Sequence, residues 1–239
     1  MPAYGRCFLP IFIMKLLLFD IDGTLLLTGG AGKVAFERVF EELFDIKDAW
    51  KNLHPDGKID PAIIAELGHK NFGRDLSKDE YQKIYEKYHL YFEEELPRSE
   101  RFRLMPGVTN LLGLLSKCKD VLLGIATGNF EGTAKLKLKQ AKLDHHFKFG
   151  GFADRARDRV HMTEQAIRKG HEQASCEVAH ENVFVIGDSI HDIDAAKAHG
   201  VKSIAVLTGS TPKEDLESKG PHAIFEDLSN AESFLQALD

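Results

Sequence analysis

Short uninterrupted runs of apolar residues alternate with longer segments of helical periodicity along most of this chain. Such runs are typical of strands that are buried on both faces of a parallel sheet. Four of them stand out: KLLLF at 15–19, VLLGIA at 121–126, NVFVI at 182–186 and SIAVL at 203–207. Helical patterns follow the second and third runs, at 130–143 and 189–199, and Gly200 is suited to end the latter helix. The repetition of strand, loop and helix predicts an α/β fold with a parallel sheet and right-handed crossovers.

The segment between the first and second strands has a different pattern. Residues 31–103 show helical periodicity throughout and contain no strand-like run. We therefore expect two parts in this chain: an α/β core made of residues 1–28 and 104–239, and a helical insert at 29–103.

Local signals inside the insert predict where its elements begin and what they bury. A helix is expected to start at Asp60 and Pro61, with the aspartate as its N-cap and the proline in its first turn. LMPGV at 104–108 is expected to form a turn that leads back to the sheet. Four tyrosines with near-helical spacing are expected to pack within the insert: Tyr81, Tyr85, Tyr88 and Tyr91.

Composition narrows the classes of function. The chain has 239 residues, of which 43% are hydrophobic and 28% charged, and its formal net charge is -6. These values are ordinary for a globular protein with a sizeable core. The acidic balance argues against nucleic-acid binding, which usually needs a basic face. The three cysteines (Cys7, Cys118 and Cys176) are widely spaced and form no C-x-x-C pair, which favours reduced thiols over a disulfide framework.

The N-terminal stretch RCFLPIFIMKLLLF has some features of a signal peptide. However, Pro10 and Lys15 interrupt the apolar run, no small-residue cleavage site follows, and the run is too short to span a bilayer. We interpret residues 1–13 as an extension ahead of the first strand, with Met14 as an alternative start. The sequence thus predicts a soluble, cytoplasmic protein with no membrane or nucleic-acid partner, and leaves monomer and dimer open.

Polar residues follow three of the predicted strands. DIDGT at 20–24 follows the first strand, TGN at 127–129 the second and GDS at 187–189 the third, with Asp192 one helical turn later. Sites in open parallel sheets form outside the carboxyl ends of the strands, so these groups are expected to converge. Carboxylates are costly to bury without partners. Their convergence from three strands therefore indicates a chemical site and not core packing.

With these motifs the chain resembles the haloacid dehalogenase-like hydrolases, and among them the phosphatases similar to phosphoglycolate phosphatase. The resemblance covers most of residues 15–239 and is carried by DIDGT at 20–24, IATGN at 125–129 and VIGDSIHDIDAAKAHG at 185–200. It implies a Rossmann-like three-layer α/β sandwich with a parallel sheet, in which the helical insert is a cap placed after the first strand. It also implies Mg²⁺-dependent hydrolysis of a small phosphate ester through an aspartyl-phosphate.

The resemblance implies roles for four aspartates. Asp20 would be the nucleophile and a metal ligand, and Asp22 the general acid and then base, with its backbone carbonyl also on the metal. Asp188 would be the other Mg²⁺ carboxylate and Asp192 a weaker ligand. Hard oxygen ligands suit Mg²⁺, and a carboxylate can form an acyl-phosphate. Dehalogenases lack the second aspartate of the first motif because no leaving alcohol needs a proton, so Asp22 favours a phosphatase or phosphomutase.

Substrate contacts are implied on both sides of the site. Thr127, Gly128 and Asn129 would bind the transferring phosphoryl group. HPDGKID at 54–60 is similar to a cap loop of phosphoglycolate phosphatase-like relatives. Within this loop, Lys58 is a candidate for binding a substrate carboxylate, and a solvated lysine in a polar turn is the alternative interpretation.

The basic residue of the site is the least defined of the expected parts. Family members commonly carry a lysine followed by proline, and this chain has no such pair at 145–170. Arg159, just before a predicted helix at 160–171, is our candidate, because an arginine fork can hold phosphate and carboxylate together. Three other cations of the region stay as alternatives: Lys148, Arg155 and Arg157.

Three hypotheses of function follow from the sequence. The first is a Mg²⁺-dependent phosphatase of a small phosphoglycolate-like ester. The second is a sugar phosphomutase similar to β-phosphoglucomutase, which would use the same core. The third is a catalytically idle protein that binds a phospho-ligand, but an idle site has no evident need for Asp20, Asp22, Thr127 and Asp188 together.

Overall fold

The structure is a computed structural model that describes residues 14–55 and 57–239. The predicted N-terminal extension at 1–13 lies outside the described residues. Within the described ranges, no helix is both long enough and apolar enough to cross a membrane.

One six-stranded sheet forms the centre of the molecule, and every strand pair in it is parallel. The strand order is β5-β4-β1-β6-β7-β8. The strands are β1 (Lys15–Phe19), β4 (Val121–Ala126), β5 (Phe149–Gly151), β6 (Val183–Gly187), β7 (Lys202–Val206) and β8 (Ala223–Phe225). The predicted strands at 15–19 and 121–126 have the same bounds here, and those at 182–186 and 203–207 are each displaced by one residue. The predicted α/β class with a parallel sheet is confirmed.

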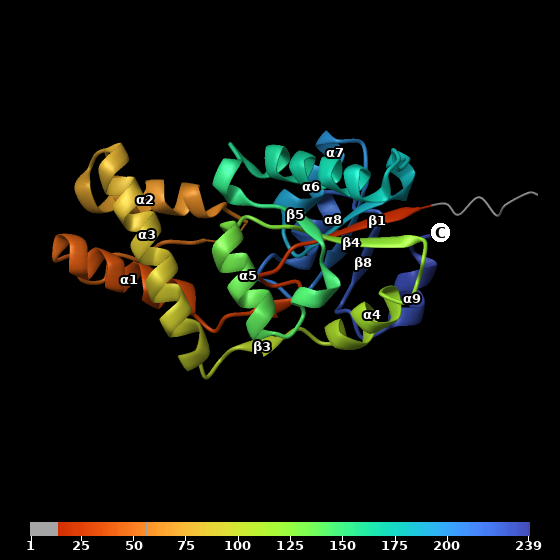
Figure 1. Cartoon of the computed structure of the whole chain (residues 1–239), viewed down its shortest axis with the longest axis horizontal. Helices are drawn as coiled ribbons and strands as arrows, with labels where there is room; N and C mark the ends of the chain where they lie inside the picture. Colours follow the sequence, from red (N-terminus) through yellow and green to blue (C-terminus); the bar gives the residue numbers. More distant parts are fainter. Residues whose placement is uncertain (1–13, 56) are drawn as a thin grey trace, which may run out of the picture.

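Helices cover both faces of this sheet, which makes three layers (Figure 1). They are α4 (Val108–Leu115), α5 (Glu131–Gln140), α6 (Arg159–Ala174), α7 (Ile190–Ala198), α8 (Lys213–Ser218) and α9 (Ala231–Gln236). The alternation of side chains along β1 explains this arrangement. Leu17 and Phe19 are buried with residues of α4, α5 and α9, whereas Leu16 and Leu18 are buried with residues of α6. Short 3₁₀ turns complete the described elements: Leu96–Arg98, Asp144–His146, Ala153–Arg155 and His180–Asn182.

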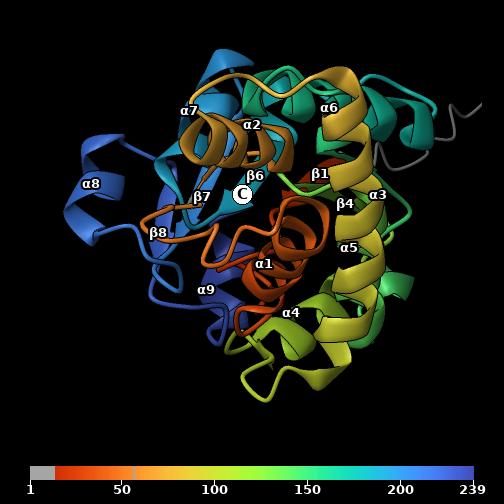
Figure 2. The ribbon, with the colours of Figure 1, turned by 90° about the vertical axis from the view of Figure 1, so that its left-hand side faces the viewer.

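The helical insert lies over the carboxyl ends of the central strands (Figures 1 and 2). Its helices are α1 (Ala31–Phe44), α2 (Asp60–Phe72) and α3 (Lys78–Glu95), as the pattern predicts. The chain enters the insert through β2 (Leu26–Leu27) and leaves through β3 (Arg103–Leu104), and these two short strands pair antiparallel. The insert is therefore attached to the sheet by two adjacent strands. The division at residues 29 and 103 stays a prediction.

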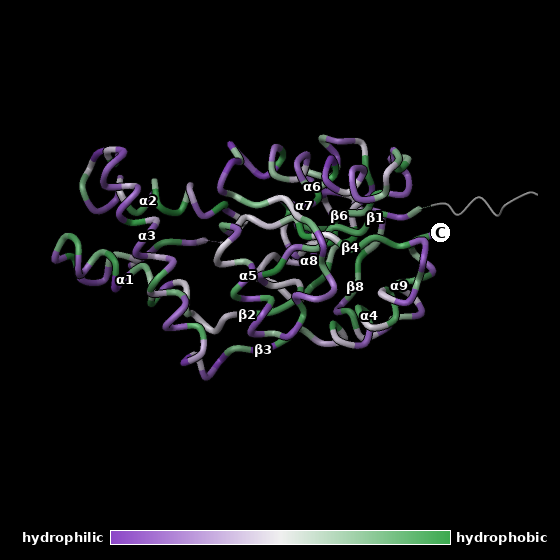
Figure 3. Tube along the Cα trace, in the orientation of Figure 1, coloured by the Kyte–Doolittle hydropathy of each residue, from purple (hydrophilic) through white to green (hydrophobic). Residues whose placement is uncertain are grey.

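A separate apolar core holds the insert together. Phe36 and Phe40 of α1, Ile64 of α2, and Tyr88 and Phe92 of α3 are buried in it. The other three tyrosines of α3 are half-buried against this cluster, as expected from their spacing. The helices of the insert accordingly alternate between hydrophobic and hydrophilic positions along their length (Figure 3).

The start of α2 differs from the prediction that Asp60 is its N-cap. Ile59 occupies the cap position, and Asp60 is the first helical residue, followed by Pro61. The Asp60 carboxylate does not cap its own helix but accepts a 2.8 Å hydrogen bond from the backbone N–H of Phe130 in the core. A tertiary contact has replaced the local cap, because Asp60 is buried between the two parts.

Candidate active site

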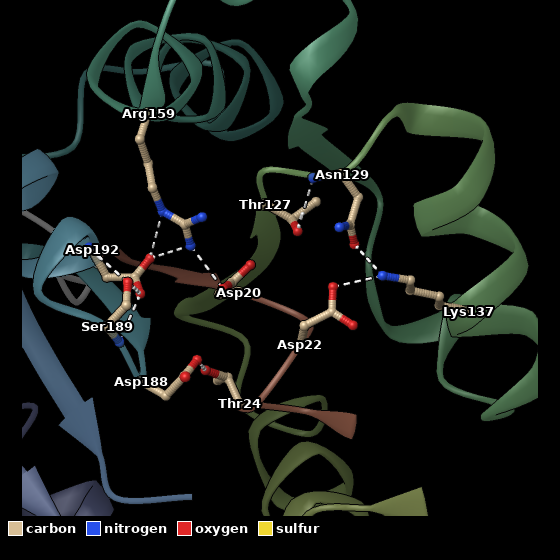
Figure 4. Close-up of polar contacts among 10 residues, drawn as sticks. All are labelled: Asp20, Asp22, Thr24, Thr127, Asn129, Lys137, Arg159, Asp188, Ser189 and Asp192. Atoms are coloured by element: carbon tan, nitrogen blue, oxygen red, sulfur yellow. Dashed lines mark hydrogen bonds and ion pairs between the residues drawn. The ribbon is translucent and has the colours of Figure 1, made fainter. Parts of the chain in front are cut away.

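Three adjacent strands bring the motif residues to one edge of the sheet. The spatial order β4, β1, β6 places the loops after these strands side by side. Asp20 follows β1, and its backbone N–H continues the ladder to the carbonyl of Ile186 at 2.9 Å. Thr127 follows β4 and Asp188 follows β6. The motif side chains thus face one another as the topology predicts (Figure 4).

Arg159 connects two of the acidic residues. It is the first residue of α6, which Asp158 caps through its side chain. Its Nη2 atom lies 2.7 Å from Asp20 Oδ2 and 2.5 Å from Asp192 Oδ1, and Nε donates to the same Asp192 oxygen at 3.0 Å. Burial alone would lower the pKa of Arg159, but Asp192 and Asp20 raise it above its ordinary value. The guanidinium therefore stays charged in this site.

The three rival cations of the sequence analysis lie elsewhere. Lys148, Arg155 and Arg157 are exposed, and the cavity at the site is not lined by any of them. The structure thus brings Arg159, and not its alternatives, next to Asp20.

Asp20, Asp188 and Asp192 form a compact acidic group. Each offers a carboxylate oxygen within 4.8 Å of the others. Thr24 donates a 3.0 Å hydrogen bond to Asp188, and Ser189 donates a 2.7 Å hydrogen bond from its hydroxyl to Asp192. Because Asp192 already accepts from Arg159 and Ser189, Asp20 and Asp188 have the more available oxygens. Carboxylate oxygens at this spacing fit a hard divalent cation such as Mg²⁺.

Burying these ionised carboxylates costs free energy unless a positive charge neutralises them. Burial raises the pKa of Asp20 to about 6, although the positive charge of Arg159 opposes this rise. The pKa of Asp188 is raised to about 8, first by burial and then by the charge of Asp20. Carboxyl groups with such raised pKa values take up either protons or a cation near neutral pH. The electrostatics therefore support the same conclusion as the donor chemistry.

Two glycines keep the space around Asp188 open. A Cβ atom on Gly209 would lie 1.7 Å from Asp188 Oδ2, and one on Gly23 would lie 2.5 Å from the same atom. Gly23 also has a positive φ of 81°, which suits glycine at the turn after the first motif. Both positions therefore require glycine if the Asp188 carboxylate is to keep its place.

Asp22 lies apart from the acidic group and faces α5. Its Oδ2 atom is 2.5 Å from the Nζ atom of Lys137, which also donates to Asn129 Oδ1 at 2.9 Å. Lys137 is absent from the sequence prediction. A signal for it exists, because Lys137 lies on the buried face of α5 with Thr133, Ala134 and Leu138. A lysine in that position is unusual unless it has a buried partner.

The loop after β4 contacts both parts of the molecule. Thr127 is buried, and its Oγ1 atom accepts from the backbone N–H of Asn129 at 3.4 Å. A Cβ atom on Gly128 would lie 2.7 Å from the carbonyl oxygen of Lys58 and 3.1 Å from Arg159 Nη1. Glycine is therefore needed where the insert approaches this loop.

A cavity of about 510 Å³ lies between the sheet edge and the insert. Asp20, Asp22, Thr127 and Arg159 line it from the core. Lys58 lines it from the insert, and its ammonium pairs with Glu66 of α2. Lys58 therefore lines the cavity, but it already has an anionic partner.

The fold and the site together define an α/β enzyme with an acidic centre beneath an inserted helical unit. The family model described as haloacid dehalogenase-like hydrolase matches residues 17–206. The chain belongs to this family.

Individual relatives are more distant. A phosphoglycolate phosphatase from Mesorhizobium japonicum is 27% identical over 205 residues, covering 83% of this chain and 85% of the relative. The pyrophosphatase PpaX of Anoxybacillus flavithermus is 23% identical, covering 92% of this chain and 95% of the relative. The crystal structure of a hydrolase from Pseudomonas syringae has a TM-score of 0.71 at 21% identity, covering 93% of this chain and 98% of that chain. This last likeness supports the fold alone.

Proposed function

We propose that this chain is a Mg²⁺-dependent phosphatase that hydrolyses a small phosphate monoester through an aspartyl-phosphate on Asp20. The position of Asp20 carries the proposal. Its buried carboxylate lies at the end of the central strand, beside Arg159 and the acidic group, and lines the cavity. The names of the Mesorhizobium and Anoxybacillus relatives support cleavage of a phosphorus–oxygen bond.

Asp20 supplies the nucleophilic oxygen in this mechanism. Arg159 contacts Oδ2, so Oδ1 is the oxygen available to attack phosphorus in line with the leaving group. A bond forms between Oδ1 and phosphorus as the bond from phosphorus to the ester oxygen breaks. Arg159 keeps Asp20 oriented and adds a positive charge beside the phosphoryl oxygens.

Asp22 is the general acid of the first half-reaction and the general base of the second. In the first, its carboxyl group donates a proton to the departing ester oxygen. In the second, the carboxylate takes a proton from the water that attacks phosphorus, which releases inorganic phosphate and restores Asp20. Its side chain is 39% exposed, so water from the cavity reaches it.

The loop after β4 binds the phosphoryl group. Because Thr127 Oγ1 accepts from the Asn129 N–H, its own hydroxyl hydrogen is free to donate to a phosphoryl oxygen. The backbone of Gly128 can approach the substrate closely because no side chain intervenes. These donors would stabilise the charge that is spread over the phosphoryl oxygens during transfer.

Asp20 and Asp188, with the backbone carbonyl of Asp22, would hold Mg²⁺. Asp192 would act mainly on Arg159 and Ser189, which already occupy its oxygens. When bound, the metal neutralises negative charge on the carboxylates and on the phosphoryl oxygens.

The cavity and the relatives support a proposal for the substrate class. Lys58 and Lys33 of the insert line the cavity, as Asp20 does from the core. A small ester with a second anionic group, such as phosphoglycolate, suits this arrangement. Lys58 would then leave Glu66 and bind the carboxylate of the substrate. Phosphoglycolate is accordingly the first substrate to test.

The test measures phosphate release by the full chain from phosphoglycolate and from p-nitrophenyl phosphate. We expect turnover with Mg²⁺, its loss in EDTA and its return with added Mg²⁺. Asp20→Asn should lower kcat by at least about 10³-fold. The matched control is Asp144→Asn, since Asp144 is exposed and does not line the cavity. Full activity of Asp20→Asn would refute the proposal.

The same assay, run also with a hexose phosphate, separates the alternatives. A phosphomutase would retain the phosphoryl group and convert one hexose phosphate into its isomer. A protein that only binds a phospho-ligand would release no phosphate from any ester. Rapid phosphate release without isomer formation excludes both.

A further inference from the structure

Lys137 is a buried lysine that no part of the mechanism above requires. Its side chain is 6% exposed, and it projects from the core face of α5. The nearby Phe92 ring of α3 has its centroid 5.6 Å from the ammonium nitrogen, so the lysine lies where the insert meets the core. Burying an ammonium is costly unless partners compensate it. The partners of Lys137 therefore indicate its role.

The partners of Lys137 are two residues of the candidate site. Its Nζ atom lies 2.5 Å from Asp22 Oδ2 and 2.9 Å from Asn129 Oδ1 (Figure 4). Asp22 comes from the loop after β1 and Asn129 from the loop after β4. One ammonium group thus connects the loop of the acid–base residue with the phosphate-binding loop.

The contact fixes the direction of the Asn129 amide. An ammonium group has only donors, so the amide must present its oxygen to Lys137. Its NH₂ group consequently points away from Lys137, toward the side of the site where Thr127 and Asp20 lie (Figure 4). A flipped amide would place two donors against each other. Lys137 therefore keeps an N–H donor of Asn129 directed to the place of the phosphoryl group.

The contact also restrains Asp22. In residues 14–55 and 57–239, Lys137 is the one side chain that donates a hydrogen bond to this carboxylate. The interaction occupies Oδ2 and leaves Oδ1 to carry and return the proton. Without it, a carboxylate that is 39% exposed would be free to change rotamer. A proton donor has to stay within hydrogen-bond reach of the leaving oxygen to be effective.

We propose that Lys137 is a positioning residue that holds Asp22 toward the leaving-group oxygen and Asn129 toward the phosphoryl group. This inference rests on the phosphatase function proposed above. It predicts two separable effects of losing Lys137. Misplacement of Asn129 weakens binding of every phosphate ester. Misplacement of Asp22 slows the phosphorylation of Asp20 only for esters whose leaving group needs a proton.

Two substrates distinguish these effects from a merely structural role. The phenolate that leaves an aryl phosphate needs little protonation, and the alkoxide that leaves an alkyl phosphate needs it fully. In Lys137→Met, we expect the single-turnover rate of Asp20 phosphorylation by the alkyl ester to fall by about 10²-fold and that by the aryl ester by less than about 5-fold, whereas dephosphorylation, which both esters share, slows equally for both. The ester concentration that gives the half-maximal phosphorylation rate should rise similarly for both esters. Lys137→Gln serves as a second uncharged variant.

The matched control is Lys135→Met on the same helix. Lys135 is 69% exposed and pairs with Glu131, one helical turn away. Its substitution should leave both activities unchanged. Asp22→Asn should show the same preference for the aryl ester in the rate of Asp20 phosphorylation. With saturating alkyl ester, Asp22→Asn/Lys137→Met should phosphorylate Asp20 no more slowly than Asp22→Asn alone, because both changes remove the same proton transfer.

The outcomes are distinguishable. Equal loss of the phosphorylation rate on both esters in Lys137→Met and Lys137→Gln, or additive losses of this rate in the double variant, would overturn the inference and leave the phosphatase proposal intact. A wild-type chain that hydrolyses neither ester would refute the proposed function, and the inference with it.

Discussion

The carboxylate of Asp60, in the first turn of α2, accepts a 2.8 Å hydrogen bond from the backbone N–H of Phe130. The backbone N–H of Asp60 in turn donates to the carbonyl of Gly128 at 2.7 Å. Two hydrogen bonds therefore attach the insert directly to the loop that is proposed to bind the phosphoryl group. This link couples the position of the insert to the geometry of the site.

The Asp60 contact should make the stability of the protein depend on pH. Burial, partly opposed by Lys137, raises the pKa of Asp60 from its ordinary value of 3.8 to about 7. A raised carboxyl pKa favours the folded state below the ordinary value, and this advantage is lost as pH rises through 7. Because one pKa unit corresponds to about 1.4 kcal/mol, the penalty at high pH is on the order of 4 kcal/mol at most.

Asp60→Asn keeps an acceptor for the Phe130 N–H but removes the charge. We expect its free energy of unfolding to exceed that of the wild type by more at pH 8 than at pH 5, as measured by urea unfolding. Asp75→Asn is the control, since Asp75 is an exposed residue of the insert. A difference that stays constant between the two pH values would show that Asp60 does not titrate in this range.

Removal of Arg159 should destabilise the site most when metal is absent. The arginine neutralises the buried Asp20 and Asp192, so Arg159→Met leaves both without their cation. Loss of one partner from a buried ion pair costs about 3 to 5 kcal/mol. We expect the fall in Tm to be larger in EDTA than with Mg²⁺, because the metal replaces part of the lost charge. An equal fall in both conditions would argue against shared neutralisation.

A methyl group on Gly209 should disturb the metal site by steric contact. Its Cβ atom would lie 1.7 Å from Asp188 Oδ2, so the carboxylate would have to move. We expect Gly209→Ala to raise the Mg²⁺ concentration for half-maximal activity by about 10-fold or more, in the range seen when supporting residues of metal sites are lost. In Gly113→Ala, the control in α4, the new atom meets nothing within 4 Å, and activity should not change. Unchanged Mg²⁺ activation of Gly209→Ala would contradict the proposed role of Asp188.

Asp188→Asn should have opposite effects on stability with and without metal. Burial raises the pKa of Asp188 to about 8, so above that pH the wild type carries the full cost of the ionised group. In EDTA at pH 9, the variant should therefore have the higher Tm. With saturating Mg²⁺ the order should reverse, because only the wild type gains binding energy from the metal. Thermal unfolding across a Mg²⁺ series tests this, and a Tm increase in the variant as large as in the wild type would contradict it.

The sequence predicted the parts of this molecule whose signals are local. The uninterrupted apolar runs of β1 and β4 gave their bounds, and the polar residues after three strands indicated which groups would meet. The strands β5 and β8 have three residues each, and the glycines of FGG conceal the former. Such short edge strands are defined by their neighbours more than by their own pattern.

Residues that act through tertiary contacts were harder to predict. Asp60 has the local pattern of an N-cap, but burial against the core gives its carboxylate another partner. Lys137 lies on the buried face of a lysine-rich helix, but its contact with Asp22 follows only from the position of α5 in the fold. The Arg159 candidate rested on its place before the predicted helix at 160–171, and its ion pair with Asp20 depends on the approach of α6 to β1.

The central claim is that the phosphoryl group of the substrate is transferred to the Asp20 carboxylate. Asp22→Asn lacks the base for the second half-reaction, whereas an aryl phosphate does not need the acid for the first. Mixing this variant with ³²P-labelled aryl phosphate, followed by acid quench and peptide mapping, tests the claim most directly. We predict stoichiometric label on the peptide that contains Asp20, and none in Asp20→Asn/Asp22→Asn. Label on another residue, or turnover with no labelled protein, would contradict the account.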